Sequence, residues 1–181
     1  MRLNTKPFIF SLALVFAGVF FAQSSAQAQS QVMRNWSWGQ YRVKFKLPST
    51  WNVTDKGARG TFKATGKAVT FWIKPWRDAS RTAKDVALAA YRSSTSIKGK
   101  RIVNQQYVSG SHGGLKEYMI VAEGWQNQNG RRRKVKIGII GMINPKSSVN
   151  LYSRFFWWAD GRYASINNSL TYKVAKSFSA Y

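Results

Sequence analysis

YRVKFKLPSTW, residues 41–51, alternates apolar and basic side chains in strict order. Successive side chains of a β-strand point to opposite faces, so this spacing predicts a strand with one apolar face and one cationic face. The apolar face is expected to enter the core, whereas the cationic face needs a separate explanation. The apolar members are Tyr41, Val43, Phe45 and Leu47, and the basic members are Arg42, Lys44 and Lys46.

Other strands are predicted on both sides of this stretch. Asn129-Gly130 is a two-residue hairpin signal, because both residues tolerate the positive φ angles of a tight turn. The strands before and after it are therefore expected to pair as neighbours. The further predicted strands are residues 61–65, 68–74, 101–109, 115–125, 131–143 and 149–158.

Two helices complete the predicted fold. Thr82-Ala83-Lys84-Asp85 has the pattern of a capping box, and a helical apolar stripe follows it up to Tyr91. Asp160 is expected to cap a second helix. The apolar seam of that helix is Tyr163, Ile166, Leu170, Val174 and Phe178. Strands, a helix, a run of antiparallel strands and a final helix predict an α+β domain with helices packed on an antiparallel sheet.

The N-terminus has the three parts of a secretory signal. Arg2 and Lys6 precede the apolar run 8–22, and Ala26-Gln27-Ala28 fits the small-x-small cleavage rule. We expect cleavage after Ala28 (residues 1–28 removed), then a linker at 29–38 and a single domain at 39–181. The alternative is an uncleaved N-terminal anchor. Cleavage predicts a periplasmic or secreted protein, and the absence of cysteine excludes disulfides and a lipoprotein anchor.

The chain is strongly basic. Its formal charge is +23, and loss of Arg2 and Lys6 leaves 27 cations against 6 anions, a charge of +21. Such a charge opposes folding by self-repulsion and attracts anions. In an export compartment the expected partners are lipopolysaccharide, anionic lipid, an acidic wall polymer or nucleic acid. An acidic protein complex is a further candidate, and a basic bias of the whole proteome is the alternative to any partner.

Two basic clusters are the predicted anion-binding sites. One is the cationic face of residues 41–47, and the other follows the predicted turn, where it would form the tip of a hairpin. A third group lies at 98–101. Either these clusters form one continuous surface or they are separate solvated patches. The predicted anion-binding residues are Arg42, Lys44, Lys46, Arg131, Arg132, Arg133, Lys134 and Lys136.

Aromatic residues add a second candidate feature, because the chain contains eight tryptophans. Exposed tryptophan beside cations can stack on bases or sugars, or lie at a membrane interface. Trp36 and Trp38 precede the predicted strand at 41–47 and are the candidates for such stacking. Core packing is the expectation for most of the others.

No catalytic residue, metal site or cofactor is predicted. The single histidine, His112, lies in the glycine-rich segment 109–114, which is typical of a turn. Glu117 and Glu123 lie six residues apart on one strand face, about 20 Å, which exceeds the spacing of a glycosidase pair. Some carboxylates are expected to pair with cations. A hydrolase that uses His112 and the carboxylates is the competing hypothesis.

Three segments give the chain a family resemblance. Phe45-x-Leu47-Pro48-x-x-Trp51-x-Val53, the helix from Thr82 to Tyr91, and Ser177-Phe178 resemble, in this order, the PsbP-like and DcrB-like domains. The resemblance implies an antiparallel sheet sandwiched between helices, an α/β/α sandwich. It also implies a non-enzymatic binding or accessory role, and it carries over no catalytic motif. The extreme basicity departs from that pattern.

Overall fold

The stretch that opened the sequence analysis forms strand β2 (Val43–Pro48) in the computed structural model. Val43, Phe45 and Leu47 are fully buried, and Lys44 and Lys46 are exposed, so the predicted alternation is confirmed. The strand begins later than expected. Tyr41 ends a short 3-10 helix, η1 (Gly39–Tyr41), and Arg42 has a left-handed φ of 49°.

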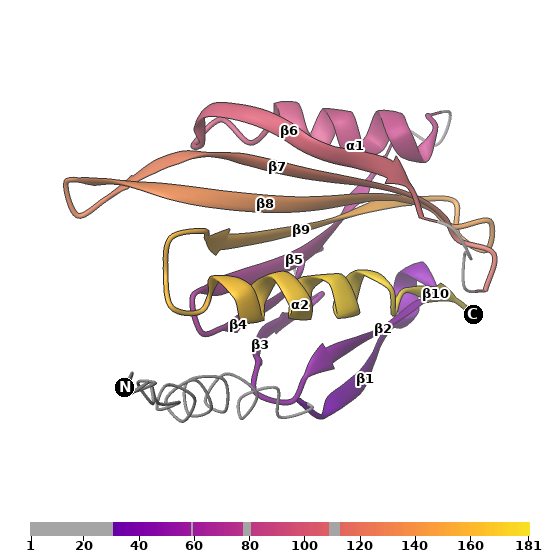
Figure 1. The fold of residues 1–181 in the computed structure, drawn as a ribbon. Coiled ribbons are helices and arrows are strands. Elements are labelled where there is room, and N and C mark those ends of the chain that lie inside the picture. Colours follow the sequence, from indigo (N-terminus) through magenta and orange to yellow (C-terminus); the bar gives the residue numbers. More distant parts are fainter. Residues whose placement is uncertain (1–30, 59, 78–80, 109–112) are drawn as a thin grey trace, which may run out of the picture. The chain divides into compact units, whose positions relative to one another are not determined.

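The structure describes residues 31–58, 60–77, 81–108 and 113–181. Within them, ten strands form two antiparallel sheets (Figure 1). The small sheet has the order β1-β2-β10 and the large sheet the order β3-β4-β5-β9-β8-β7-β6. The remaining strands are β1 (Met33–Trp38), β3 (Asn52–Lys56), β4 (Phe62–Gly66), β5 (Val69–Trp76), β6 (Lys98–Tyr107), β7 (Lys116–Gln128), β8 (Arg131–Ile143), β9 (Asn150–Trp158) and β10 (Ser179–Ala180).

The predicted α/β/α sandwich is wrong. Strands hold 54% of the described residues and helices 17%. Helix α1 (Ala83–Arg92) covers one face of the large sheet over β7 and β8. The small sheet and helix α2 (Ala164–Ala175) together bury the other face. The difference arises because the amphipathic strand β2 pairs with β1 and β10 and so supplies a second sheet where a layer of helices was expected.

Phenylalanine side chains join the two sheets. Phe45 of β2 lies 4.9 Å from Phe62 of β4 and 5.4 Å from Phe178, measured between ring centroids. Phe71 of β5 lies 4.8 Å from Phe155 of β9. All five rings are fully buried, so each contributes about 1.5–3 kcal/mol through burial. Phe178, predicted to lie on the second helix, follows α2 and belongs to this core.

The predicted start of α1 is confirmed. The Thr82 hydroxyl accepts a hydrogen bond from the backbone N–H of Asp85, and the Asp85 carboxylate accepts one from the backbone N–H of Thr82. The hydrogen bond from the Thr82 hydroxyl holds the pKa of Asp85 below its usual value. At the other end, the Lys100 ammonium donates to the carbonyls of Tyr91, Arg92 and Ser94 at 2.7–3.1 Å. Lys100 therefore ends the helix and is not a free surface cation.

The start of α2 differs from the prediction. Its N-cap is Tyr163, which makes no side-chain cap hydrogen bond, and the helix begins at Ala164. Leu170 and Val174 are buried as the seam requires, but Ile166 is 38% exposed. Asp160 lies outside the helix and pairs with Arg133 of β8. A long-range ion pair thus replaces the local cap that the sequence indicated.

The domain begins before the predicted boundary. Met33–Trp38 is strand β1 and pairs with β2 along its whole length, so it belongs to the domain and not to a linker. The compact unit spans Val32–Tyr181. The predicted signal at 1–28 lies outside the described residues. Of the helices within the described part of the chain, none has the length and apolar character needed to cross a membrane.

Strand β6 forms one edge of the large sheet. Its pairing with β7 is interrupted twice by register shifts, between Lys98 and Arg101 and between Ile102 and Asn104. Most of its side chains are exposed.

Candidate anion-binding hairpin

The β7–β8 hairpin carries the larger predicted basic cluster to one end of the large sheet (Figure 1). Asn129 and Gly130 have φ angles of 50° and 74°, so the predicted tight turn is confirmed. Arg131 and Arg132 are exposed directly after the turn. Gln128, Asn129, Arg131 and Arg133 line a depression at this tip.

Two tryptophans support the arginines of this tip. The Arg132 guanidinium lies 4.6 Å from the ring centroid of Trp125, and the Arg133 guanidinium lies 4.4 Å from that of Trp158. Arg133 also donates to Gln128 at 2.7 Å and to Asp160 at 2.8 Å. Cation–π contacts and hydrogen bonds reduce the freedom of these side chains, so less ordering entropy is lost when they bind a ligand.

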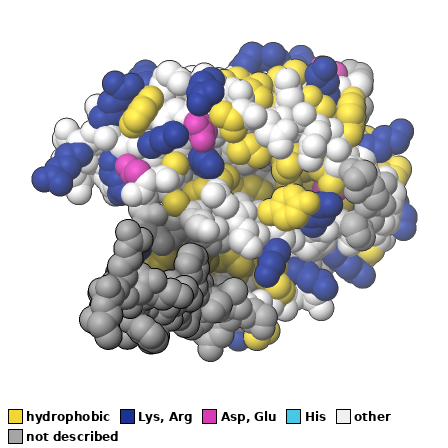
Figure 2. Space-filling model, viewed as in Figure 1, with side chains coloured by type: hydrophobic (Ala, Val, Ile, Leu, Met, Phe, Trp, Pro, Cys, Tyr) yellow, Lys and Arg dark blue, Asp and Glu magenta, His cyan; other side chains and the backbone are white. Residues whose placement is uncertain are grey.

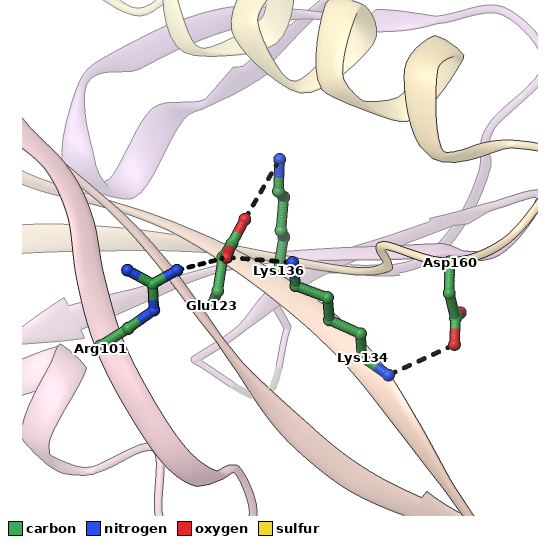
Figure 3. A network of polar contacts seen from close by, with 5 residues as sticks. All are labelled: Arg101, Glu123, Lys134, Lys136 and Asp160. Carbon is green, nitrogen blue, oxygen red and sulfur yellow. Dashed lines mark hydrogen bonds and ion pairs between the residues drawn. The ribbon is translucent and has the colours of Figure 1, made fainter.

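Glu123 gathers three cations beside the hairpin (Figure 3). Its carboxylate lies 3.3 Å from Lys134, 3.6 Å from Lys136 and 3.4 Å from Arg101. Burial alone would raise the pKa of Glu123, but the hydrogen bond from Lys134 and the three positive charges hold it below the usual value. This cluster of four residues keeps a net charge of +2.

Asp160 holds the next part of the hairpin. It accepts hydrogen bonds from the Arg133 guanidinium and, at 3.3 Å, from the backbone N–H of Lys134. The hydrogen bond from Arg133 and its charge lower the pKa of Asp160. The predicted pairing of some carboxylates with cations is therefore confirmed for Glu123 and Asp160.

The basic residues of the hairpin thus differ in how free they are to bind an added anion. Among the described residues, Arg131 and Arg132 have no acidic partner, whereas Arg133, Lys134 and Lys136 share the two carboxylates. Figure 2 shows Lys and Arg side chains gathered around acidic ones at this end of the molecule. The arrangement can bind an anion at the tip, where arginine offers a planar pair of donors to phosphate or carboxylate.

The other predicted basic residues lie elsewhere. Arg42, Lys44 and Lys46 are exposed, but β2 lies at the opposite end of the domain from the hairpin tip (Figure 1). The Lys44 ammonium lies 4.4 Å from the ring centroid of Tyr181. The two predicted clusters are therefore separate patches and not one continuous surface. Arg101 of the third group joins the hairpin through Glu123.

The tryptophans chosen from the sequence pack into the domain. Trp38 is only 5% exposed and lies 4.5 Å from Tyr41, so its selection for stacking was wrong. Trp36 is half-buried, packs on the core and lies 5.7 Å from Phe62. The sequence analysis missed both aromatic partners of the hairpin arginines, Trp158 and, within the hairpin itself, Trp125. The hairpin register set by Asn129-Gly130 places it opposite Lys134, and this register was a signal that would have found it.

The carboxylates do not assemble a site within the described residues. No three His, Cys, Asp or Glu side chains lie close enough there to hold a metal ion. Asp55 accepts a hydrogen bond from the backbone N–H of Gly57, and Asp85 caps α1. The hydrolase hypothesis depends on His112 and the carboxylates, and His112 and Asp78 lie outside the described residues.

Glu117 is the one described carboxylate that is buried, at 3% exposure. Its Oε1 has no hydrogen-bond partner among the described residues, and burial raises its pKa to about 8. It is therefore neutral in the folded protein at pH 6, whereas the unfolded chain ionises near pH 4.5. The unfolded state binds fewer protons between these values, so the free energy of unfolding falls as pH rises from about 4.5 to 8.

We predict that Glu117→Gln removes this part of the pH dependence. The wild-type protein should lose a few kcal/mol relative to the variant between pH 5 and pH 8, since one pKa unit corresponds to about 1.4 kcal/mol. Urea unfolding of both proteins at several pH values measures the difference. Equal slopes in the two proteins would show that Glu117 is ionised in the folded state.

Comparison with solved structures identifies the class of fold. The chain has a Mog1/PsbP-like fold. The Ran-binding protein Mog1p of Saccharomyces cerevisiae matches with a TM-score of 0.60 and 7% identity over 83% of this chain and 96% of Mog1p. A point mutant of Mog1 matches with a TM-score of 0.59 and 8% identity, covering 82% of this chain and 96% of its own.

At sequence identities of 7% and 8%, the similarity to these structures establishes a shared fold and nothing more. The PsbP-like part of the predicted resemblance is confirmed at that level. No protein-family model and no curated protein matches the chain, so the DcrB-like part has no support.

Proposed function

We propose that the protein is an exported, non-enzymatic binding protein whose β7–β8 hairpin contacts a polyanion of the cell envelope. The observation that carries the proposal is the hairpin tip. Arg131 and Arg132 are exposed there and have no acidic partner in the described part of the chain. The Arg132 guanidinium packs against the ring of Trp125. The signal pattern at 1–28 supports export, and the formal charge of +21 on residues 29–181 supports an anionic partner.

The chemistry of the tip favours phosphate-rich surfaces. An arginine guanidinium binds phosphate through two parallel hydrogen bonds, and a basic residue near an anionic membrane contributes about 1 kcal/mol. Exposed charges are screened by salt, so binding should weaken steeply as ionic strength rises.

We predict that the double variant Arg131→Glu/Arg132→Glu binds anionic vesicles at least about thirtyfold more weakly, from the loss of two contributions of about 1 kcal/mol. Co-sedimentation with vesicles containing phosphatidylglycerol, at low and physiological salt, measures this. Both side chains are exposed, so the thermal unfolding midpoint should not change appreciably.

The matched control is Lys44→Glu/Lys46→Glu, which makes the same change of charge on β2 at the other end of the domain. The proposal requires this variant to bind vesicles far better than the hairpin variant. Equal losses would mean that binding follows net charge. Absence of binding to phosphatidylglycerol, lipopolysaccharide and DNA at low salt would overturn the polyanion proposal.

An accessory protein that docks on an acidic protein complex is the second candidate. The fold likeness to Mog1p, which is described as a Ran-binding protein, favours this alternative. Pull-down from an envelope extract with the wild-type protein and the hairpin variant separates the candidates. A protein captured by both in high salt supports a protein partner that binds elsewhere than the hairpin.

A further inference from the structure

A second surface lies on the face of the large sheet that carries α1. That helix covers β7 and β8 and reaches β9, but on the same face the side chains of β4 and β5 beyond it are exposed or half-exposed. Here the strand registers place Lys63, Trp72 and Arg154 in one row, and Lys74 beside Tyr152 in the next. We call this surface the Trp72 face: Lys63, Trp72, Lys74, Trp76, Tyr152 and Arg154.

Aromatic rings and arginines alternate across the Trp72 face. The Arg154 guanidinium lies 5.7 Å from the ring centroid of Trp72 and 5.6 Å from that of Tyr152. The rings of Tyr152 and Trp76 are 6.2 Å apart, and the Arg81 guanidinium lies 5.9 Å from Trp76. All three rings of the face are half-buried, so a part of each is open to a ligand.

Hydrogen bonds hold the Arg154 side chain in place, but no carboxylate neutralises its charge within the described residues. It donates to the Ala90 carbonyl at 2.6 Å and to the Ser93 hydroxyl at 3.0 Å at the end of α1, and it has no acidic partner among the described residues. Its Nε and the Trp76 Nε1 are buried donors for which the described residues offer no acceptor.

The rim of the Trp72 face carries two lysines and one carboxylate. Lys63, in the Trp72 row, and Lys74, in the next row, are both exposed. The nearest carboxylate by strand register is Asp55, opposite Lys63 on β3, and it already accepts a hydrogen bond from the Gly57 backbone. The surface therefore combines planar aromatic rings with an excess of cations.

We propose that the Trp72 face binds single-stranded nucleic acid. Unpaired bases stack on aromatic side chains with little regard to sequence, while cations track the phosphates. A strand of phosphates without bases would use the cations but would have no planar ring to stack on Trp72. This site is distinct from the hairpin, and it stands whether or not the hairpin binds an envelope polyanion.

The test compares two labelled oligonucleotides of about ten nucleotides, one of thymidylate and one abasic, with the same number of phosphates. Fluorescence anisotropy with the full-length protein measures both affinities. We expect the thymidylate strand to bind roughly tenfold more tightly than the abasic strand, and Trp72→Ala to remove most of this preference. Trp72→Phe keeps a ring and should retain most of it.

Control variants separate stacking from charge and from damage to the fold. Tyr172→Ala, which removes an exposed ring beside Lys176 on α2, should leave the preference unchanged. Arg131→Glu/Arg132→Glu should weaken the binding of both oligonucleotides equally or of neither. The ratio of the two affinities should therefore stay the same. If the two strands bind alike, or if Trp72→Phe loses the preference as fully as Trp72→Ala while its unfolding midpoint is normal, stacking on Trp72 is excluded and the proposal fails.

Discussion

Ile137→Glu is expected to unfold the protein, whereas the same substitution at the neighbouring residue, Lys136→Glu, is expected to be tolerated. Ile137 is 1% exposed and lies between the large sheet and α1, packed in the cluster that contains Ala87 and Ile120. Loss of its side chain removes about 2–5 kcal/mol. An unpaired carboxylate buried there adds several kcal/mol more, so the total approaches the 5–15 kcal/mol of a typical domain.

The control residue points to the opposite face of the same strand. The Lys136 side chain is 27% exposed and lies 3.6 Å from Glu123. Glutamate there replaces an attraction with a repulsion at a partly exposed site, which costs on the order of 1 kcal/mol. Urea unfolding followed by far-ultraviolet circular dichroism measures both variants. Similar midpoints for the two would contradict the assignment of faces on β8.

Gly141→Ala is expected to destabilise the domain by about 3 kcal/mol, because β8 and α1 approach each other at this residue. An added Cβ would collide with the Ala83 carbonyl and lie 2.7 Å from the Ala87 backbone nitrogen. Both atoms belong to the backbone of α1, so the helix would have to move away from the sheet. Overpacking of this kind typically costs 1–3 kcal/mol, and loss of helix contacts adds to it.

Gly138→Ala is the matched control on the same strand. The nearest atoms to a Cβ at this position are side-chain atoms of Phe155 and Trp157 at 3.5–3.7 Å, which is ordinary van der Waals contact. Alanine also reduces the conformational freedom of the unfolded chain, so this variant should be neutral or slightly more stable. Equal destabilisation of both variants in urea would show that the loss of glycine, and not the contact with α1, is responsible.

Local sequence patterns predicted the structure correctly where adjacent residues determine it. The alternation of β2, the capping box at Thr82 and the turn at Asn129-Gly130 each depend on a few adjacent residues, and all are confirmed. The hairpin tip with Arg131 and Arg132 followed from the turn. The charge of the tip was therefore predictable, although its ligand remains a proposal.

The predictions that were wrong concern contacts between residues that are distant in sequence. A strand pattern does not say which sheet the strand joins, so β1, β2 and β10 were not recognised as a second sheet. Asp160 fits a helix cap by its position, but Arg133, 27 residues away, binds it instead. Arg101, Glu123 and Lys134 come from three strands, and only the register of β6, β7 and β8 brings them together.

The irregular edge strand β6 also affects whether two copies of the chain can pair through their sheets. An outermost strand exposes unpaired backbone groups to which a second copy of the chain can add a strand. Its two register shifts interrupt the flat row of donors and acceptors, and the cations Lys98 and Arg101 would meet like charges in an approaching copy. The basic residues of β6 are therefore expected to oppose self-association at this edge of the sheet, whichever ligand the rest of the surface binds.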